Sequence, residues 1–460
     1  MTAMNDSGLF KVDALTGTRR LFYLISPNES SFATINEVPD YINESSPFFM
    51  VAVFLEIIIG HLHGNHKIYR VNDTISSMGA GMFMMLLAGL TRMFVHAAEF
   101  VVYIWIYNNY RVVDIPWNSP WGWLLCFLGV DLGYYWFHRL AHEVNFMWAA
   151  HQVHHSSEDY NLGTALRQSI LQRYTSWIFY VPMALFVSPS TAFVHIQFNT
   201  LYQFWIHTEL ITSLGPLGYI LNTPSHHRVH HGRNPYCIDK NYAGTLIIWD
   251  RIFGTFEPEK VRIVYGLVHP IASWDPIYIQ FCHLMHMWNM FCTLPGLGNK
   301  LSVVFKGPGW EPGKPRCGLI EDLPKVKYPE PRYDSRHSSW ADGYLILHFA
   351  LLYLLLADLS NGREILLQSV LFCTLGYMIL SLTSFGAICD KKPYAALLEF
   401  IRCALYLLCD ATLTTPVTPL LGIGQISTKA QIFNGIFTVS AIVWCIQGIR
   451  EYVSEKAKIQ

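Results

Sequence analysis

The chain has 460 residues, of which 52% are hydrophobic and only 14% are charged, and its net charge is −1. Soluble proteins usually carry about a quarter charged residues, so this composition favours a polytopic membrane protein. The net charge gives no sign of nucleic-acid binding, and ten cysteines without a C-x-x-C pair argue against a disulfide framework.

The first 45 residues are polar enough to lie outside the membrane. The first membrane span is predicted at about 47–60. The apolar stretch from 75 to 107 is too long for one span of about 20 residues. It therefore forms either one span plus an interfacial helix, or a tight hairpin.

Histidines cluster directly after the next predicted span, 121–137, in the sequence HRLAHEVNFMWAAHQVHH. Residues three and four apart share one helix face, so H-x3-H and H-x2-HH each aim at one point. His142 and His151 are nine residues apart, which at about 100° per residue puts them on opposite sides of a straight helix. The chain is therefore predicted to break near 144–146. The H-x2-HH pattern returns in TPSHHRVHH, and the eight histidines are His138, His142, His151, His154, His155, His227, His230 and His231.

Eight imidazoles are too many for one metal ion, and neutral imidazole suits iron, zinc, copper and nickel. We therefore predict a dinuclear site with four or five ligands per ion. A membrane hairpin is predicted from 174–187 and 191–206, and it ends at His207. His207 is either a ninth ligand or a polar residue at the membrane interface.

All-nitrogen ligation favours a redox pair, because hydrolytic zinc sites normally use three protein ligands and a water. A pair of irons held in this way could use O2 to attack an unactivated C–H bond. Glu143 and Glu209 lie beside the histidines, where each either orients a ligand ring or is a solvated charge.

The segment 208–342 is rich in Pro, Gly, Lys and Arg. His283 and His286 within it are predicted to belong to a packing helix. Four further spans are predicted at about 344–359, 365–388, 394–410 and 430–449. The distribution of basic residues places the histidines and the final residues in the cytosol, where Lys456 and Lys458 resemble a dilysine signal for retrieval to the endoplasmic reticulum.

Over residues 120–260 the chain resembles the fatty acid hydroxylase superfamily of membrane di-iron enzymes. The resemblance rests on DLGYYWFHRLAHE, HQVHH, HHRVHH and NYAGTLIIWDRIFGTF. NLGTALRQS, GPGWEPGKPRCG and the extra C-terminal spans look most like the alkylglycerol monooxygenase branch of that superfamily.

This resemblance implies an all-α fold, a polytopic transmembrane helical bundle with a cytosolic histidine-rich di-iron cap. The expected regions are an N-terminal extramembrane segment (1–45), a membrane region (46–119), a catalytic domain (120–260), a cytosolic loop region (261–342), a C-terminal membrane block (343–450) and a tail (451–460).

The resemblance also implies a reaction and its participants. The carbon beside the ether oxygen of a 1-O-alkylglycerol or related lyso-alkyl phospholipid is hydroxylated with O2 and tetrahydrobiopterin, giving a fatty aldehyde. Enzymes that regenerate the pterin and oxidise the aldehyde are expected nearby. The eight histidines match the family's iron ligands, and His207 matches a further histidine of relatives. His227 is preferred over His226, and Glu143 is predicted to act at or beside the metals.

Two alternative functions keep the metal site but change what it does. The same di-iron site could serve a sterol or fatty-acyl hydroxylase or desaturase supplied by cytochrome b5, although the chain lacks a fused His-Pro-Gly-Gly motif. A membrane metal-binding or transport protein is the other alternative. Transporters place ligands near the membrane midplane rather than at span ends.

Overall fold

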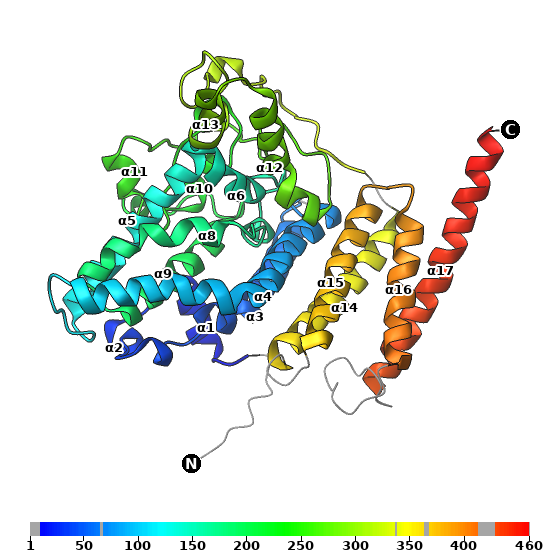
Figure 1. Ribbon diagram of the computed structural model, residues 1–460, viewed down its shortest axis with the longest axis horizontal. Coiled ribbons are helices and arrows are strands. Elements are labelled where there is room, and N and C mark those ends of the chain that lie inside the picture. The colour runs from blue at the N-terminus through cyan, green and yellow to red at the C-terminus, as the bar shows by residue number, and fades with distance from the viewer. Residues whose placement is uncertain (1–9, 65–67, 336–337, 363–367, 413–427, 460) are drawn as a thin grey trace. The chain divides into compact units, whose positions relative to one another are not determined.

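Figure 1 shows the computed structural model of the chain, which describes residues 10–64, 68–335, 338–362, 368–412 and 428–459. Within those residues the secondary structure consists of α-helices and short 3-10 helices. β-structure there is limited to two isolated bridges, Leu221 with Leu246 and Gly232 with Tyr265. The predicted all-α fold is confirmed.

The helices belong to two compact units. The first comprises Met1–Arg70, Ala80–Ile271 and Gln280–Arg332, and the second comprises Val71–Gly79, Ala272–Ile279 and Tyr333–Gln460.

In the first unit the helices are α1 (Ala14–Leu21), α2 (Pro27–Ser30), α3 (Tyr41–Leu62), α5 (Pro120–Glu143), α6 (Asn145–His155), α7 (Leu162–Ala165), α8 (Gln172–Ser176), α9 (Pro189–Trp205), α10 (Pro224–His230), α11 (Ile248–Ile252) and α13 (Leu297–Phe305). The second unit contains α14 (Ser339–Gly362), α15 (Gln368–Cys389), α16 (Ala395–Thr412) and α17 (Thr428–Ile459). Two helices begin in the second unit and continue in the first, α4 (Val71–Tyr110) and α12 (Pro276–Thr293).

Four helical stretches of the described chain are long and apolar enough to cross a membrane: Ile35–Leu62, Ser339–Leu359, Gln368–Cys389 and Ala430–Ser454. They support a multi-pass membrane protein. The other predicted spans 121–137, 191–206 and 394–410 also form helices, but these are not among the four.

Two membrane predictions need correction. The stretch 174–187 is not a span, because it is divided among α8 and the 3-10 helices Trp177–Phe179 and Val181–Leu185. Pro182 lacks the N–H that a continuous helix requires, and the segment packs instead against α5. The alternative of a hairpin within 75–107 is also wrong, since α4 is one continuous helix of 40 residues.

The helix that carries His138 and His142 (α5) and the helix that ends just before His207 (α9) share a start signal. A Ser-Pro pair precedes both, and the serine hydroxyl accepts a hydrogen bond from a backbone N–H of the first turn: Ser119 from Gly122 and Ser188 from Thr191. Proline at the first helical position loses no helical hydrogen bond. The sequence therefore fixes where α5 and α9 begin.

The predicted break between the histidine clusters is confirmed at Val144. This residue is extended (φ −127°, ψ 117°), so α5 ends at Glu143 and α6 begins at Asn145. Asn145 is fixed by three hydrogen bonds: its N–H donates to the Lys306 carbonyl (2.7 Å), its Nδ2 donates to the Val303 carbonyl (2.8 Å), and its Oδ1 accepts from His283 Nε2 (2.6 Å). The helices α12 and α13 thus hold the turn that folds one cluster back onto the other.

A buried carboxylate joins α5 and α9 to the segment after α10. Asp131 of α5 is fully buried and accepts hydrogen bonds from the N–H groups of Thr245 (2.7 Å) and Leu246 (2.9 Å), from Trp249 Nε1 (2.9 Å) and from Asn199 Nδ2 (2.7 Å). A buried charge with four donors is fully satisfied. Asp131 therefore fixes the relative positions of the elements that carry the histidines.

The second unit has a polar network at the centre of an otherwise apolar bundle. Arg402 donates to both carboxylate oxygens of Glu399 (2.8 and 2.5 Å) and to His348 Nδ1 (2.8 Å), and both partners of the ion pair are fully buried. Ser384 donates to Glu399 (2.6 Å), and His348 Nε2 donates to Ser440 Oγ (2.9 Å). All four helices of the bundle contribute to this network.

Candidate metal centre

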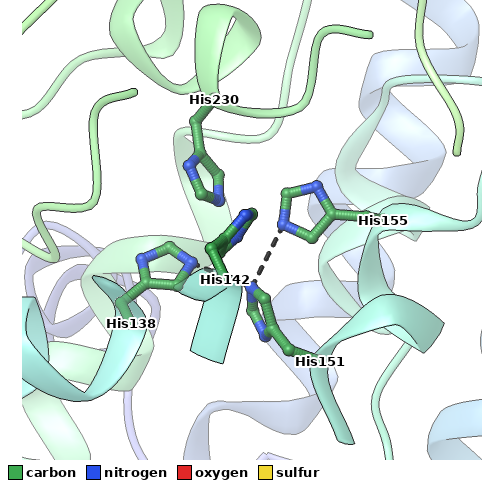
Figure 2. A group of neighbouring side chains, drawn as sticks. All are labelled: His138, His142, His151, His155 and His230. Atoms are coloured by element: carbon green, nitrogen blue, oxygen red, sulfur yellow. Dashed lines mark hydrogen bonds between the residues drawn. The ribbon is translucent and has the colours of Figure 1, made fainter. Parts of the chain in front are cut away.

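The nine histidines predicted as ligands lie in two buried groups. In each group one ring nitrogen per residue lies within 4.8 Å of the others. The five-histidine group is His138, His142, His151, His155 and His230, and the four-histidine group is His154, His207, His227 and His231. Figure 2 shows the rings of the five-histidine group converging on one point. Each group could hold one metal ion, which agrees with the predicted dinuclear site.

Helical spacing explains how the H-x2-HH patterns are divided between the groups. His151 and His155 are four residues apart on α6 and belong to the five-histidine group, whereas His154 lies on another face and belongs to the four-histidine group. On α10 and its C-cap, His227 and His231 share the four-histidine group and His230 belongs to the other. Each H-x2-HH pattern thus contributes to both groups, so the expectation that each pattern aims at one point is wrong.

Hydrogen bonds fix the protonation of the rings. A carbonyl oxygen can only accept, so a ring nitrogen that contacts one must carry the proton. The Nδ1–H groups of four histidines donate to backbone carbonyls: His138 to Tyr242 (2.7 Å), His154 to Arg167 (3.1 Å), His207 to Gln203 (2.6 Å) and His230 to Lys240 (3.0 Å). His151 Nδ1 donates to Gln172 Oε1 (3.2 Å). The Nε2 atoms of these five neutral rings are left as bare acceptors.

These acceptors face one another, which is the observation that best fits a metal ion. His154 and His207 approach with their Nε2 atoms 3.1 Å apart, and the Nε2 atoms of His138 and His151 are 2.9 Å apart. Two lone pairs at that distance repel unless a cation lies between them. Imidazole nitrogens bind zinc at about 2.1 Å, and two ligands at right angles would then lie about 3.0 Å apart. Among the nine histidines, three more Nε2 atoms are buried without a hydrogen-bond partner, those of His142, His230 and His231.

The pKa values agree with neutral rings. Burial, and secondarily the neighbouring imidazoles, lowers the pKa of most of these histidines well below 6.5: His138, His151, His155, His207, His227, His230 and His231. Burial lowers the pKa of His154 to about 4. Neutral imidazole is the form that binds a metal.

The neighbouring carboxylates have other partners than the prediction suggested. Glu143 is half-buried and forms an ion pair with Arg139 (2.9 Å), one turn earlier on α5, and its predicted role at the metals remains a prediction. Glu209 accepts from the Tyr265 hydroxyl (3.0 Å). In the described chain, one ion pair joins a carboxylate to a ring of the nine histidines: Asp239 lies 3.7 Å from His142 Nδ1. No sequence pattern had indicated Asp239.

The geometry distinguishes His226 from His227. His227 lies in the four-histidine group with its Nε2 3.0 Å from that of His207. His226 is buried outside both groups, and its ring packs against Phe256. The repeated H-x2-HH spacing favours the same residue, and the role of His227 as a ligand remains a prediction.

The supporting backbone carbonyls could not be predicted, because any residue type supplies one. Tyr242, whose carbonyl orients His138, does lie in the NYAGTLIIWDRIFGTF motif. Asp250 of the same motif accepts from the N–H groups of Tyr242 and Ala243 (2.8 Å each). Asp250 thus fixes the backbone whose carbonyl orients His138. The Asp in this motif was the only sequence feature that could have indicated this support.

Comparison with known proteins agrees with the geometry of the site. Residues 123–255, which include all nine histidines, match the fatty acid hydroxylase family, and residues 342–424 match the alkylglycerol monooxygenase C-terminal domain. No solved structure shows significant similarity to the chain.

Relatives cover almost the whole chain. An alkylglycerol monooxygenase of Xenopus tropicalis is 49% identical over 99% of both chains, and one of Homo sapiens is 49% identical over 97% of this chain and 98% of its own. An alkylglycerol monooxygenase of Caenorhabditis elegans is 38% identical over 85% of this chain and 80% of its own. The chain therefore belongs to the alkylglycerol monooxygenase family.

Proposed function

We propose that this protein is a di-iron monooxygenase that hydroxylates the carbon next to the ether oxygen of 1-O-alkylglycerols. The names of its relatives support an ether-lipid monooxygenase. The observation that carries the proposal is the pairing of bare Nε2 acceptors, as in His154 and His207, which fits bound cations in a buried site.

The nine histidines would hold the two ions, five for one and four for the other. Iron bound there would supply the O2-dependent redox chemistry that zinc cannot provide. The carbonyls that accept from Nδ1 keep each ring in one tautomer and one orientation. Burial of all nine rings excludes water, which protects a reactive centre from side reactions.

The proposed reaction is balanced with one two-electron donor. One oxygen atom of O2 enters the C–H bond, and the other leaves as water with two electrons and two protons from tetrahydrobiopterin. In the resulting hemiacetal the bond between the hydroxylated carbon and the glycerol oxygen breaks, and the hydroxyl proton passes to that oxygen. The products are a fatty aldehyde and glycerol or a glycerol derivative.

An external reductant agrees with the sequence, because His269-Pro270 continues as Ile271-Ala272 and is not the haem-binding motif of a fused cytochrome b5. We further propose that the protein lies in the endoplasmic reticulum membrane with the histidines and the C-terminus in the cytosol. The basic residues of 208–342 and the Lys456 and Lys458 pair support this orientation.

The experiment supplies membranes containing the protein with a 1-O-alkylglycerol, O2 and tetrahydrobiopterin, and measures fatty aldehyde. His155→Ala should abolish the product, whereas His226→Ala, a change at a buried histidine outside both groups, should keep it. Product formation with NADH and cytochrome b5 but not with the pterin would contradict the proposed reductant. Iron-loaded protein without turnover under either reductant would contradict the substrate.

A further inference from the structure

A buried acidic residue of the first predicted span contacts the chain beside the four-histidine group. Glu56 of α3 is only 2% exposed. Its carboxylate accepts hydrogen bonds from the hydroxyls of Thr208 and Tyr69 and from the Leu162 N–H (2.8 Å). A charged residue in an apolar helix is costly and usually serves a function. Here all three partners are donors, and each comes from a different segment.

The contact with Thr208 leads to two ligands. Thr208 directly follows His207, and its carbonyl accepts a hydrogen bond from Arg228 Nη1 (3.0 Å). Arg228 directly follows His227, and it is also fixed by an ion pair with Glu259 (2.7 Å). Glu56 therefore fixes Thr208, and Thr208 connects the backbone next to His207 with the side chain of the residue after His227.

The contact with Leu162 leads to the same group by a second route. Two residues before Leu162, the ring of Tyr160 stacks on that of His207 with centroids 5.7 Å apart and lies 5.3 Å from that of His231. The Tyr160 hydroxyl donates to the Ile206 carbonyl (2.9 Å). The loop anchored on Glu56 thus covers one face of the His207 ring and also contacts the His231 ring.

We propose that Glu56 is a positioning residue for the four-histidine group, which holds His207 and His227 in register from outside the coordination sphere. The inference rests on the proposed metal binding. Groups that orient metal ligands typically change metal affinity or activity by about 10–100-fold when they are replaced. In the described chain, no histidine of the five-histidine group forms a hydrogen bond with Glu56, Thr208 or Leu162. The ion in that group should therefore be retained when Glu56 is replaced.

The first test compares Glu56→Gln with Glu44→Gln in the full-length protein. Glu44 is another carboxylate on α3, and its partner is Arg20 (2.5 Å), away from the histidines. Iron per folded chain is measured by mass spectrometry before and after timed exposure to a chelator. We expect Glu56→Gln to release one of two ions at least about tenfold faster, with kcat lowered and KM for the alkylglycerol unchanged, and Glu44→Gln to match the parent.

A matched pair at Thr208 keeps the test valid if Glu56→Gln does not fold. Thr208→Val removes the hydroxyl without changing the shape, and Thr208→Ser keeps it. We expect the valine variant to lose one ion as above and the serine variant to retain both. Retention of both ions at the parental rate in folded Glu56→Gln or Thr208→Val would overturn the proposal, as would equal loss of both ions. A parent protein that binds no metal would instead overturn the proposed function.

Discussion

His154 and His207 are 53 residues apart in the sequence, yet their Nε2 atoms lie 3.1 Å from each other deep in the protein. Each ring donates its Nδ1 proton to a backbone carbonyl, so neither can donate to the other. The folded structure therefore brings together groups that repel, and a bound cation would convert this repulsion into attraction. Metal binding and stability should be linked.

Metal removal should consequently lower stability. A ligand that binds only the folded state at 1,000 times its Kd stabilises it by about 4 kcal/mol. We expect chelation to lower the Tm of the purified protein, and iron restoration to recover it. A Tm that chelation leaves unchanged, in protein shown by mass spectrometry to have lost its iron, would contradict the linkage.

Neighbouring histidines provide a second test. His227→Ala removes a member of the four-histidine group, whereas His226→Ala removes a buried ring outside both groups. We expect His227→Ala to lose one iron per chain and its activity, and His226→Ala to keep two irons with at most a modest loss of stability. The readouts are iron content and aldehyde production, and the opposite result would move the ligand to His226.

The sequence predicted the site better than the membrane part. Histidine spacing follows directly from helix geometry, so the break near Val144 and the eight histidines of the three patterns could be read from the chain. His207 stayed open on spacing alone and was added by the family resemblance. The assignment of each ring to a group was not predicted, because the H-x2-HH pattern was expected to aim at one point. In the structure residues four apart, such as His151 and His155, share a group, and His154 belongs to the other.

Other features depend on tertiary contacts that the sequence does not show. The stretch 174–187 is as apolar as a span, but it is short, contains Pro182, and finds its apolar partners on α5. Glu56 was visible only as a charge within a span, and its meaning required its contact with Thr208, 152 residues later. Backbone carbonyls that orient the rings have no sequence signature at all.

The turn between α5 and α6 should be sensitive to pH through His283. Burial, and secondarily His286, lowers the pKa of His283 to about 4, from 6.5. The unfolded chain takes up a proton below pH 6.5 and the folded protein does not, so this contribution to stability is complete above pH 6.5 and is lost as the pH falls towards 4. The free energy of unfolding falls by at most about 3.4 kcal/mol, since each pH unit between the two pKa values corresponds to about 1.36 kcal/mol.

His283→Gln tests this directly, since glutamine keeps an N–H donor for Asn145 Oδ1 but does not titrate. We expect the Tm of the variant to fall less steeply than that of the parent between pH 6.5 and 5. Parallel Tm curves for the two proteins over this range would show that His283 does not contribute to the pH dependence.

The C-terminal bundle offers a test that is independent of the metals. Glu399→Gln would leave the charge of Arg402 buried without its partner, and breaking a buried ion pair typically costs about 3–5 kcal/mol. Replacing both residues with apolar ones of similar size, as in Glu399→Leu with Arg402→Met, removes the unpaired charge and should recover much of that loss. Glu451→Gln, at an exposed position of α17, should change stability by less than about 0.5 kcal/mol.

The measurement is the free energy of unfolding or the Tm in one detergent for all four proteins. If Glu399→Gln is as stable as the parent, Arg402 finds another partner. If the double variant is no more stable than Glu399→Gln, the loss of stability comes mainly from His348 and Ser384, which are left without their partners in the network.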